Sequence, residues 1–240
     1  MVGPLLVFDL DGTLADTAPD LLATLEAVLP RHRIPVAIDS SFRDGIGLGA
    51  RYLIEYALKR QNLAVGKPTL DAIHRDFLEH YEANICVGTR LFPGTIALLD
   101  RFAGAGWSFA VCTNKPERMS RLLLRELGIA DRFAAIGGGD SFASRKPDPT
   151  HLLMTIAAAS GSPDRSVMVG DSRTDIDTAR GARIPIVGVA FGYTPEPMAT
   201  LAPDLFIESF DQLKPKQAAS LFSARAIGGE PAEAAAATAP

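Results

Sequence analysis

The sequence is poor in cysteine and has no long uninterrupted hydrophobic run. Its two cysteines, Cys86 and Cys112, lie within apolar stretches of a 240-residue chain. This is typical of reduced, buried thiols and argues against a disulfide framework or a cysteine metal site. The first apolar run ends at Asp9, and no basic segment precedes it. We therefore expect neither a secretory signal nor a membrane span, and we expect a cytoplasmic protein.

The sequence also lacks an excess of basic residues. It contains 24 Lys and Arg against 28 Asp and Glu, for a formal net charge of −4 at pH 7. Such a balance provides no broad positive field for nucleic acid or for an anionic membrane surface, so we expect small-molecule or protein partners. With 47% hydrophobic residues, the chain can bury a sizeable core in one or two domains. The sequence does not indicate an oligomeric state.

Short apolar runs alternate with helical patterns over most of the chain. The runs are bounded by Gly, Asp or Pro and are typical of buried strands: residues 5–8, 107–113, 133–136, 166–169 and 186–190. Helical spacing lies between them, at residues 94–104, 116–127, 149–159 and 174–181. This alternation predicts an α/β fold with a doubly wound parallel sheet that is covered on both faces.

Residues 17–88 interrupt this alternation, because they contain no convincing strand pattern. Amphipathic helical spacing covers the segment instead, for example at Phe77 and Tyr81. The C-terminal end is rich in Ala, Gly, Pro and Glu, a composition typical of disorder. The predicted domains are an α/β core of residues 1–16 and 89–222, an inserted helical cap of residues 17–88, and a disordered tail of residues 223–240.

Two pairs of aspartates follow two of the predicted strands. Asp9 and Asp11 can face one side of an extended segment, because they are two positions apart. Asp171 and Asp175 can share one face of the next helix, because they are four positions apart. The carboxyl ends of parallel strands meet at one edge of the sheet, where ligands bind. Four carboxylates gathered there need a cation, and oxygen ligands without nearby His or Cys favour Mg²⁺.

The same edge carries groups that suit a phosphate. Thr113 and Asn114 follow the second strand, just before a predicted helix, and Lys146 follows the third strand through a glycine-rich loop. A hydroxyl, a lysine ammonium and backbone N–H groups near a helix start can form a phosphate cradle. A divalent metal and a free carboxylate beside such a cradle indicate phosphoryl transfer.

Four segments, in order along the chain, resemble the sequence motifs of the haloacid dehalogenase superfamily: DLDGTLAD, VCTNK, SRKPDP and VGDSRTDID. The helical insertion after the first motif resembles the C1 cap of that superfamily, and the resemblance covers roughly residues 4–212. It implies a Rossmann-like core with an inserted helical cap. It also implies a Mg²⁺-dependent phosphatase that acts on a small phosphorylated metabolite.

The resemblance implies a role for each motif residue. Asp9 would be the nucleophile that forms an aspartyl phosphate. Asp11 would protonate the leaving group and then deprotonate the attacking water. The Mg²⁺ site would consist of Asp9, the backbone carbonyl of Asp11, Asp171 and Asp175, the last either through water or as an orienting partner. The transferring phosphoryl group would be held by Thr113, Asn114 and Lys146, and Lys146 would also temper the charge on Asp9.

The predicted cap would select the substrate by closing over the leaving group. Its most suggestive stretch is FRDGIGLGAR, in which Gly45 and Gly47 permit close approach of the backbone to a ligand. A connector between two helices is the alternative interpretation of these glycines. Arg43 and Arg51 flank them, and either could pair with a carboxylate on the substrate.

Within the superfamily, several segments resemble those of phosphoglycolate phosphatases: IGLGA, TNKP, GGGDSFASRKPDP and GVAFGYTP. This implies hydrolysis of 2-phosphoglycolate to glycolate and phosphate. Thr174 and the segment GVAFGY depart from the usual pattern, so another small phosphate ester or pyrophosphate is an alternative substrate. Two other functions stay open, a sugar phosphomutase and a receiver-like signalling module that carries a phosphoaspartate.

Overall fold

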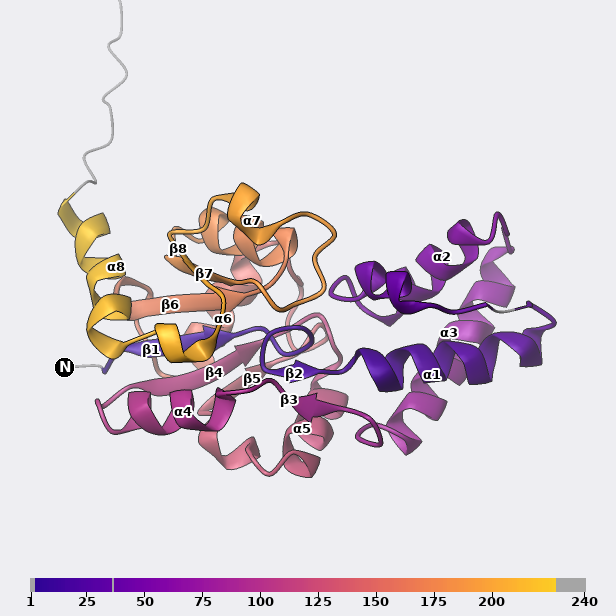
Figure 1. Cartoon of the computed structure of the whole chain (residues 1–240), viewed down its shortest axis with the longest axis horizontal. Helices are drawn as coiled ribbons and strands as arrows, with labels where there is room; N and C mark the ends of the chain where they lie inside the picture. Colours follow the sequence, from indigo (N-terminus) through magenta and orange to yellow (C-terminus); the bar gives the residue numbers. More distant parts are fainter. Residues whose placement is uncertain (1–2, 36, 228–240) are drawn as a thin grey trace, which may run out of the picture.

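A six-stranded parallel sheet forms the centre of the molecule (Figure 1). The computed structural model describes residues 3–35 and 37–227. In spatial order, the strands are β5 (Ala135–Gly137), β4 (Ser108–Cys112), β1 (Leu5–Phe8), β6 (Ser166–Gly170), β7 (Ile186–Val189) and β8 (Leu205–Ile207). All neighbouring pairs are parallel, which confirms the predicted fold class. From β1 the chain adds β4 and β5 on one side, and it then returns to add β6, β7 and β8 on the other side. A ligand is expected at such a switch point, beside the carboxyl end of β1.

Helices cover both faces of the sheet because the strands are apolar on both faces. In β1, Leu6 and Phe8 belong to one buried cluster, and Leu5 and Val7 belong to the other, as the two-residue period of a strand requires. The first cluster includes side chains of α4 (Thr95–Ala103), α5 (Glu117–Glu126) and α8 (Pro215–Ile227). The second includes side chains of α6 (Pro149–Ala158) and α7 (Arg173–Gly181).

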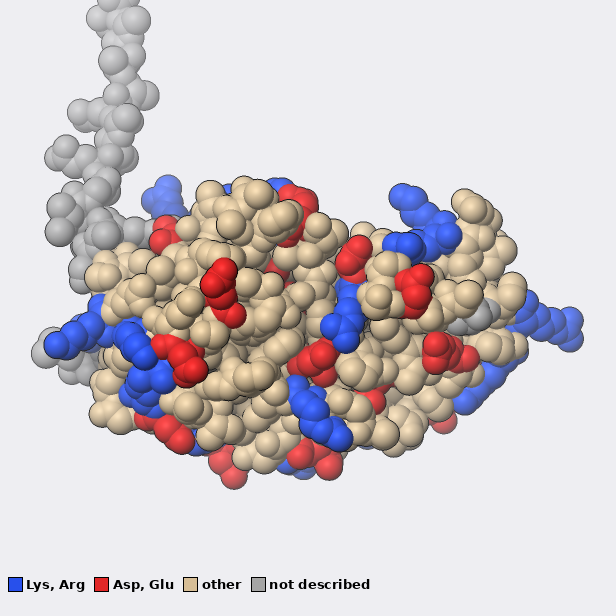
Figure 2. All heavy atoms as spheres, in the orientation of Figure 1, with Lys and Arg blue, Asp and Glu red and all other residues tan. Residues whose placement is uncertain are grey.

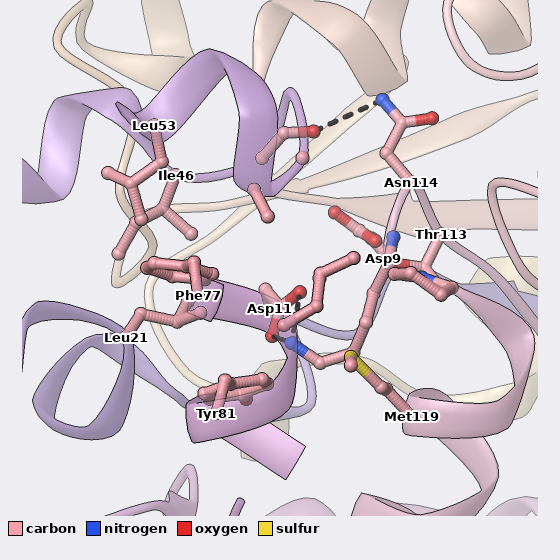
Figure 3. Close-up of a pocket in the computed structure, with 16 residues that line it drawn as sticks. Asp9, Asp11, Leu21, Ile46, Leu53, Phe77, Tyr81, Thr113, Asn114 and Met119 are labelled. Atoms are coloured by element: carbon pink, nitrogen blue, oxygen red, sulfur yellow. Dashed lines mark hydrogen bonds and ion pairs between the residues drawn. The ribbon is translucent and has the colours of Figure 1, made fainter. Parts of the chain in front are cut away.

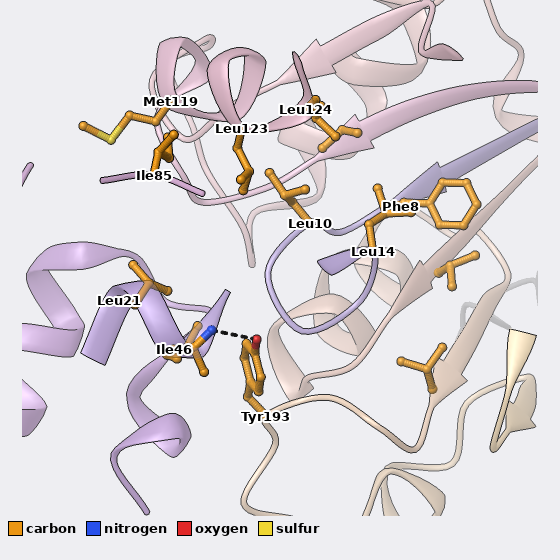
Figure 4. Packing of buried hydrophobic residues seen from close by; sticks show 14 of the residues in the cluster. Phe8, Leu10, Leu14, Leu21, Ile46, Ile85, Met119, Leu123, Leu124 and Tyr193 are labelled. Atoms are coloured by element: carbon orange, nitrogen blue, oxygen red, sulfur yellow. Dashed lines mark hydrogen bonds between the residues drawn. The ribbon is translucent and has the colours of Figure 1, made fainter. Parts of the chain in front are cut away.

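Three helices inserted between β1 and β4 form a second layer beside the carboxyl ends of the strands (Figure 1). They are α1 (Ala18–Val28), α2 (Ala50–Arg60) and α3 (Lys67–Ala83), and both α1 and α2 pack on α3. We call residues 17–88 the helical insertion. Its Leu21 and Ile46 share one hydrophobic cluster with Leu10 and Leu14 of the core (Figure 4). Apolar packing therefore continues from the core into the insertion.

Two chain segments connect the insertion to the core, and they lie side by side. The short strands β2 (Ala15–Asp16) and β3 (Arg90–Leu91) pair antiparallel. Asp20 is buried at the start of α1 and accepts hydrogen bonds from the N–H groups of Gly88 (2.7 Å) and Thr89 (2.8 Å). It also accepts one from the hydroxyl of Thr89 (2.7 Å). These bonds fix the distance between the two connecting segments.

The end of the core differs from the sequence prediction. Helix α8 continues to Ile227, so residues 223–227, which we expected to begin a disordered tail, are helical. That boundary was wrong because alanine and arginine, which are good helix formers, continue the helix there. The rest of the expected tail, residues 228–240, lies outside the described residues. Within the described part, each helix is too short or too polar to cross a bilayer. On the face shown in Figure 2, basic and acidic side chains are interspersed.

Replacing Asp20 with Ala is expected to lower the free energy of unfolding by about 2 kcal/mol, because three donors lose their acceptor inside the protein. Urea denaturation measures the difference. The control is Glu26→Ala, which removes an exposed carboxylate from the same helix and should change stability by less than about 0.5 kcal/mol. Equal losses in the two variants would contradict the role of Asp20 in joining the segments.

Candidate active site

Three aspartates from two strand ends form a compact acidic cluster. Asp9 follows β1, whereas Asp171 and Asp175 follow β6. One carboxylate oxygen from each of them lies within 4.8 Å of the other two, and all three side chains are buried. Asp9 donates its N–H to the carbonyl of Val169 (2.9 Å), so the pairing of β1 with β6 continues to the site. Parallel pairing therefore brings together carboxylates that are far apart in sequence.

Among the described residues, Lys146 is the only positive side chain that pairs with this cluster. Its Nζ lies 2.9 Å from Oδ1 of Asp9 and 2.7 Å from Oδ1 of Asp175. When all three carboxylates are ionised, they and one ammonium leave two negative charges in excess. Burial, opposed by Lys146 and reinforced by Asp175, raises the pKa of Asp9 to about 7. Burial and the two neighbouring carboxylates also raise the pKa of Asp171. A divalent cation that prefers oxygen ligands fits this set of donors and would balance its charge.

Glycines allow the backbone to pack closely around Asp171. A Cβ at Gly12 would lie 2.4 Å from Oδ2 of Asp171, and one at Gly192 would lie 2.1 Å from its Cβ. Gly12 also has a φ of 87°, which other residues rarely adopt. The hydroxyl of Thr13 donates to Oδ1 of Asp171 (2.7 Å), and the N–H of Tyr193 donates to Oδ2 (2.9 Å). The orientation of this carboxylate is therefore fixed from several sides.

Asp175 is both a helix cap and a member of the cluster. Its Oδ2 accepts hydrogen bonds from the N–H and the hydroxyl of Ser172 (3.1 and 2.7 Å), and these two residues form a capping box at the start of α7. Its Oδ1 accepts the bond from Lys146. Because Oδ2 is held at the start of α7, the position of Oδ1 is fixed. Asp175 is therefore well suited to orient Lys146.

The carboxylate of Asp11 does not join the cluster. Both of its oxygens pair with Nζ of Lys115, at 2.9 and 3.1 Å. The same ammonium lies 4.5 Å from the ring centroid of Tyr81 in α3. The expectation of four converging carboxylates is thus corrected to three, because Lys115 holds the carboxylate of Asp11. Sequence reasoning assigned no role to Lys115, although it directly follows the predicted phosphate-binding pair.

Thr113 and Asn114 follow β4 and lie at the same edge of the sheet. Oγ1 of Thr113 accepts the N–H of Lys115 (3.2 Å). Asn114 donates its side-chain amide to the carbonyls of Lys146 (3.1 Å) and Gly47 (3.2 Å), whereas its Oδ1 is buried without a partner. Asn114 therefore links the Lys146 loop to the helical insertion, and Figure 3 shows its bond to the insertion.

His151 is a second residue that sequence reasoning missed. It is buried in α6, where its Nδ1 accepts the N–H of Lys146 (3.1 Å) and its Nε2 donates to the carbonyl of Gly138 (3.0 Å). Burial and the Lys146 ammonium lower the pKa of His151 to about 4, so the ring is neutral at pH 7. A histidine five positions after the motif lysine, at the start of a helix, was the available signal.

A cavity of about 30 Å³ lies between the core and the helical insertion (Figure 3). Its polar wall comes from the core and consists of Asp9, Asp11, Thr113, Asn114 and Lys115. Apolar side chains of the insertion form much of the opposite wall, namely Leu21, Ile46, Leu53, Phe77 and Leu78, and Tyr81 lies beside them. The predicted nucleophile, the predicted proton donor and the predicted phosphate-binding pair therefore line the same cavity.

Of the candidates in the insertion, which were Arg43, Gly45, Gly47 and Arg51, only Gly47 lines this cavity. Arg43 lies 3.6 Å from a carboxylate oxygen of Asp16, and Arg51 lies 2.7 Å from one of Asp71. Both arginines therefore pair with carboxylates of the protein itself. The structure brings neither of them to the cavity.

The fold and this site define a known class of enzyme. The family model for haloacid dehalogenase-like hydrolases matches residues 6–189. The chain belongs to the haloacid dehalogenase-like hydrolase family, and the resemblance seen in its motifs is confirmed.

Relatives within the family narrow the comparison. The chain is 45% identical to a phosphoglycolate phosphatase of Mesorhizobium japonicum over 224 residues. This match covers 93% of the chain and 99% of that relative. It is 42% identical over 214 residues to a phosphoglycolate phosphatase of Agrobacterium fabrum, covering 89% and 92%. A solved structure of a predicted phosphoglycolate phosphatase from Haemophilus somnus matches with a TM-score of 0.80 and 30% identity, covering 87% and 95%. The predicted similarity to phosphoglycolate phosphatases is confirmed.

The raised pKa of Asp9 predicts a pH-dependent cost in metal-free protein. Folding raises the pKa of Asp9 from 3.8 to about 7, so the protonated carboxyl group favours the folded state over the unfolded one. This stabilisation is complete below pH 3.8 and is lost as the pH rises through 7. Asp9→Asn removes this cost. In EDTA at pH 8 we expect the variant to exceed the wild type by ~2–4 kcal/mol in urea denaturation, with no gain at pH 4. A difference that stays constant with pH would contradict the charge excess.

Proposed function

We propose that the chain is a Mg²⁺-dependent phosphatase that hydrolyses 2-phosphoglycolate through an aspartyl phosphate. The observation that carries the proposal is the acidic cluster, in which Lys146 holds the buried carboxylate of Asp9 next to Asp171. Family membership and the relatives named phosphoglycolate phosphatases support it. A cytoplasmic location and a small phosphorylated metabolite as partner, without nucleic acid or membrane, complete the proposal.

Asp9 acts as the nucleophile. Its carboxylate oxygen bonds to phosphorus while the bond from phosphorus to the leaving alcohol breaks, and water then attacks the aspartyl phosphate to release phosphate. Asp11 lines the same cavity and is the group available for proton transfer. It donates a proton to the alcohol oxygen in the first step and takes one from water in the second. Such catalysis contributes roughly 10²–10⁴ to the rate.

Charge neutralisation comes from Lys146 and from the metal. The Lys146 ammonium opposes the effect of burial on Asp9 and so favours the ionised nucleophile. Asp9, Asp171 and the backbone carbonyl of Asp11 would hold Mg²⁺, oriented by Asp175, and the ion would offset negative charge on the phosphoryl group. Thr113 and Asn114 line the same cavity, and Oδ1 of Asn114 has no hydrogen-bond partner there.

The helical insertion acts as a cap domain over a core of residues 1–16 and 89–222. Its apolar wall closes the cavity, and the bond from Asn114 to the Gly47 carbonyl joins the two parts. Exclusion of water strengthens the electrostatic interactions inside and protects the acyl phosphate until the hydrolytic step. The paired segments β2 and β3 are the two connections between the cap and the core.

A panel of phosphate compounds tests the substrate. We expect kcat/KM for 2-phosphoglycolate to exceed that for pyrophosphate, glucose phosphates and nucleoside monophosphates by more than about tenfold, or roughly 1.4 kcal/mol. EDTA and Asp9→Asn should each abolish turnover. A smaller preference would contradict the substrate but not the phosphatase. Transfer of phosphate to a sugar would indicate a mutase, and a stable phosphoprotein without turnover would indicate a receiver-like module.

Lys146→Met should lower kcat by about 10²–10³, because methionine occupies similar space but carries no charge. The measurement is steady-state hydrolysis of 2-phosphoglycolate, with circular dichroism to confirm folding. Lys216→Met, an exposed lysine on α8, is the control and should leave kcat within twofold of the wild type. A folded Lys146→Met enzyme with full activity would rule out the proposed role of this ammonium.

A further inference from the structure

Lys115 places a buried positive charge in the polar wall of the cavity. Among the described residues it is the only cation that lines this space, and its side chain is 4% exposed. Burial opposes its charge, but the carboxylate of Asp11 raises the pKa of Lys115 above the ordinary lysine value. The group is therefore an ammonium ion at neutral pH.

The pairing with Asp11 leaves the ammonium of Lys115 able to bind a ligand. A lysine ammonium carries three N–H donors, and the two oxygens of Asp11 accept from it at 2.9 and 3.1 Å. The surrounding wall consists largely of apolar side chains such as Leu21, Phe77 and Met119, which offer no acceptor. The cavity therefore favours a substrate that brings an anionic acceptor to this place.

The chemistry of a hydroxy-acid ester meets this requirement. The ester oxygen receives its proton from Asp11, and the two oxygens of Asp11 lie within 3.1 Å of Nζ of Lys115. In the phosphate ester of a 2-hydroxy acid, a single carbon separates that ester oxygen from the carboxyl carbon. The carboxylate of the substrate is thus delivered to the neighbourhood of Lys115.

Tyr81 supplies an independent observation at the same place. Its hydroxyl is buried and has no hydrogen-bond partner, and its side chain lines the cavity. Burial raises the pKa of Tyr81 to about 12, so the phenol keeps its proton. A buried donor without a partner beside a buried ammonium is suited to an anionic ligand.

We propose that Lys115 binds the carboxylate of the leaving group and so selects phosphate esters of short hydroxy acids over esters of neutral alcohols. This inference rests on the proposed phosphatase function of the cavity. It assigns carboxylate recognition to the core rather than to Arg43 and Arg51 of the insertion, both of which pair with carboxylates of the protein.

Two esters of equal length test the proposal. 2-Phosphoglycolate and 2-hydroxyethyl phosphate differ by a carboxylate against a hydroxymethyl group at the same position. The quantity to measure is the ratio of their kcat/KM values, because any effect of Lys115 on Asp11 alone changes both esters equally and cancels. We expect the wild type to prefer 2-phosphoglycolate by about 100-fold or more, as sites built to pair with a polar group do.

Lys115→Met and Lys115→Gln should each reduce this ratio by at least about 30-fold. Two neutral replacements are used so that a folding defect in one does not decide the result. Lys59→Met is the control, since it removes an exposed lysine of the insertion and should leave the ratio unchanged. Equal slowing of both esters in the Lys115 variants would overturn the proposal while leaving the phosphatase function intact.

The proposed function can fail separately. If the wild type hydrolyses neither ester, calorimetric titration with 2-phosphoglycolate still decides the inference. We then expect Lys115→Met to bind it at least about 30-fold more weakly than the wild type. Equal affinity in the two proteins, or no binding to the wild type, would overturn the role of Lys115.

Discussion

The arrangement of the site depends on a buried ammonium group held between two carboxylates. Lys146 bridges Asp9 and Asp175, and its own backbone N–H is held by the neutral ring of His151. One ammonium cannot neutralise three carboxylates, so the cluster carries an excess of negative charge. Because the cluster is buried, water does not screen this charge as it would at the surface. The same constraint explains the tight packing around Asp171, since a carboxylate repelled by its neighbours must be held in place by fixed donors.

The site contains two buried lysine–aspartate ion pairs. Lys146 pairs with Asp9 in the acidic cluster, and Lys115 pairs with Asp11 in the polar wall of the cavity. Both aspartates come from one strand end, so one short segment of backbone sets their separation. The sheet order places β4 and β6 on either side of β1. This topology places Thr113 and Asn114 on one side of Asp9, and Asp171 and Asp175 on the other.

Much of the core could be predicted from sequence, because buried parallel strands are short apolar runs and their ends carry unusual polar residues. The strands from β1 to β7 in the sheet and the acidic residues of the cluster followed from that pattern. The three-residue edge strand β8 and the two-residue pair of β2 with β3 are too short to show any period. Lys115 and His151 were missed for another reason. Each acts through a contact that only the fold creates, and nothing in local spacing distinguishes a buried lysine from an exposed one.

The number of protons released when Mg²⁺ binds measures the buried charge excess most directly. At pH 7 the raised pKa of Asp9, about 7, keeps part of this carboxyl group protonated, and a bound cation must displace that proton. Calorimetry in buffers of different ionisation enthalpy counts them. We expect on the order of one proton per Mg²⁺ at pH 7, far fewer at pH 9, and a smaller release from Asp9→Asn. Binding of Mg²⁺ without proton release at pH 7 would contradict a cluster that carries more negative charge than Lys146 can balance.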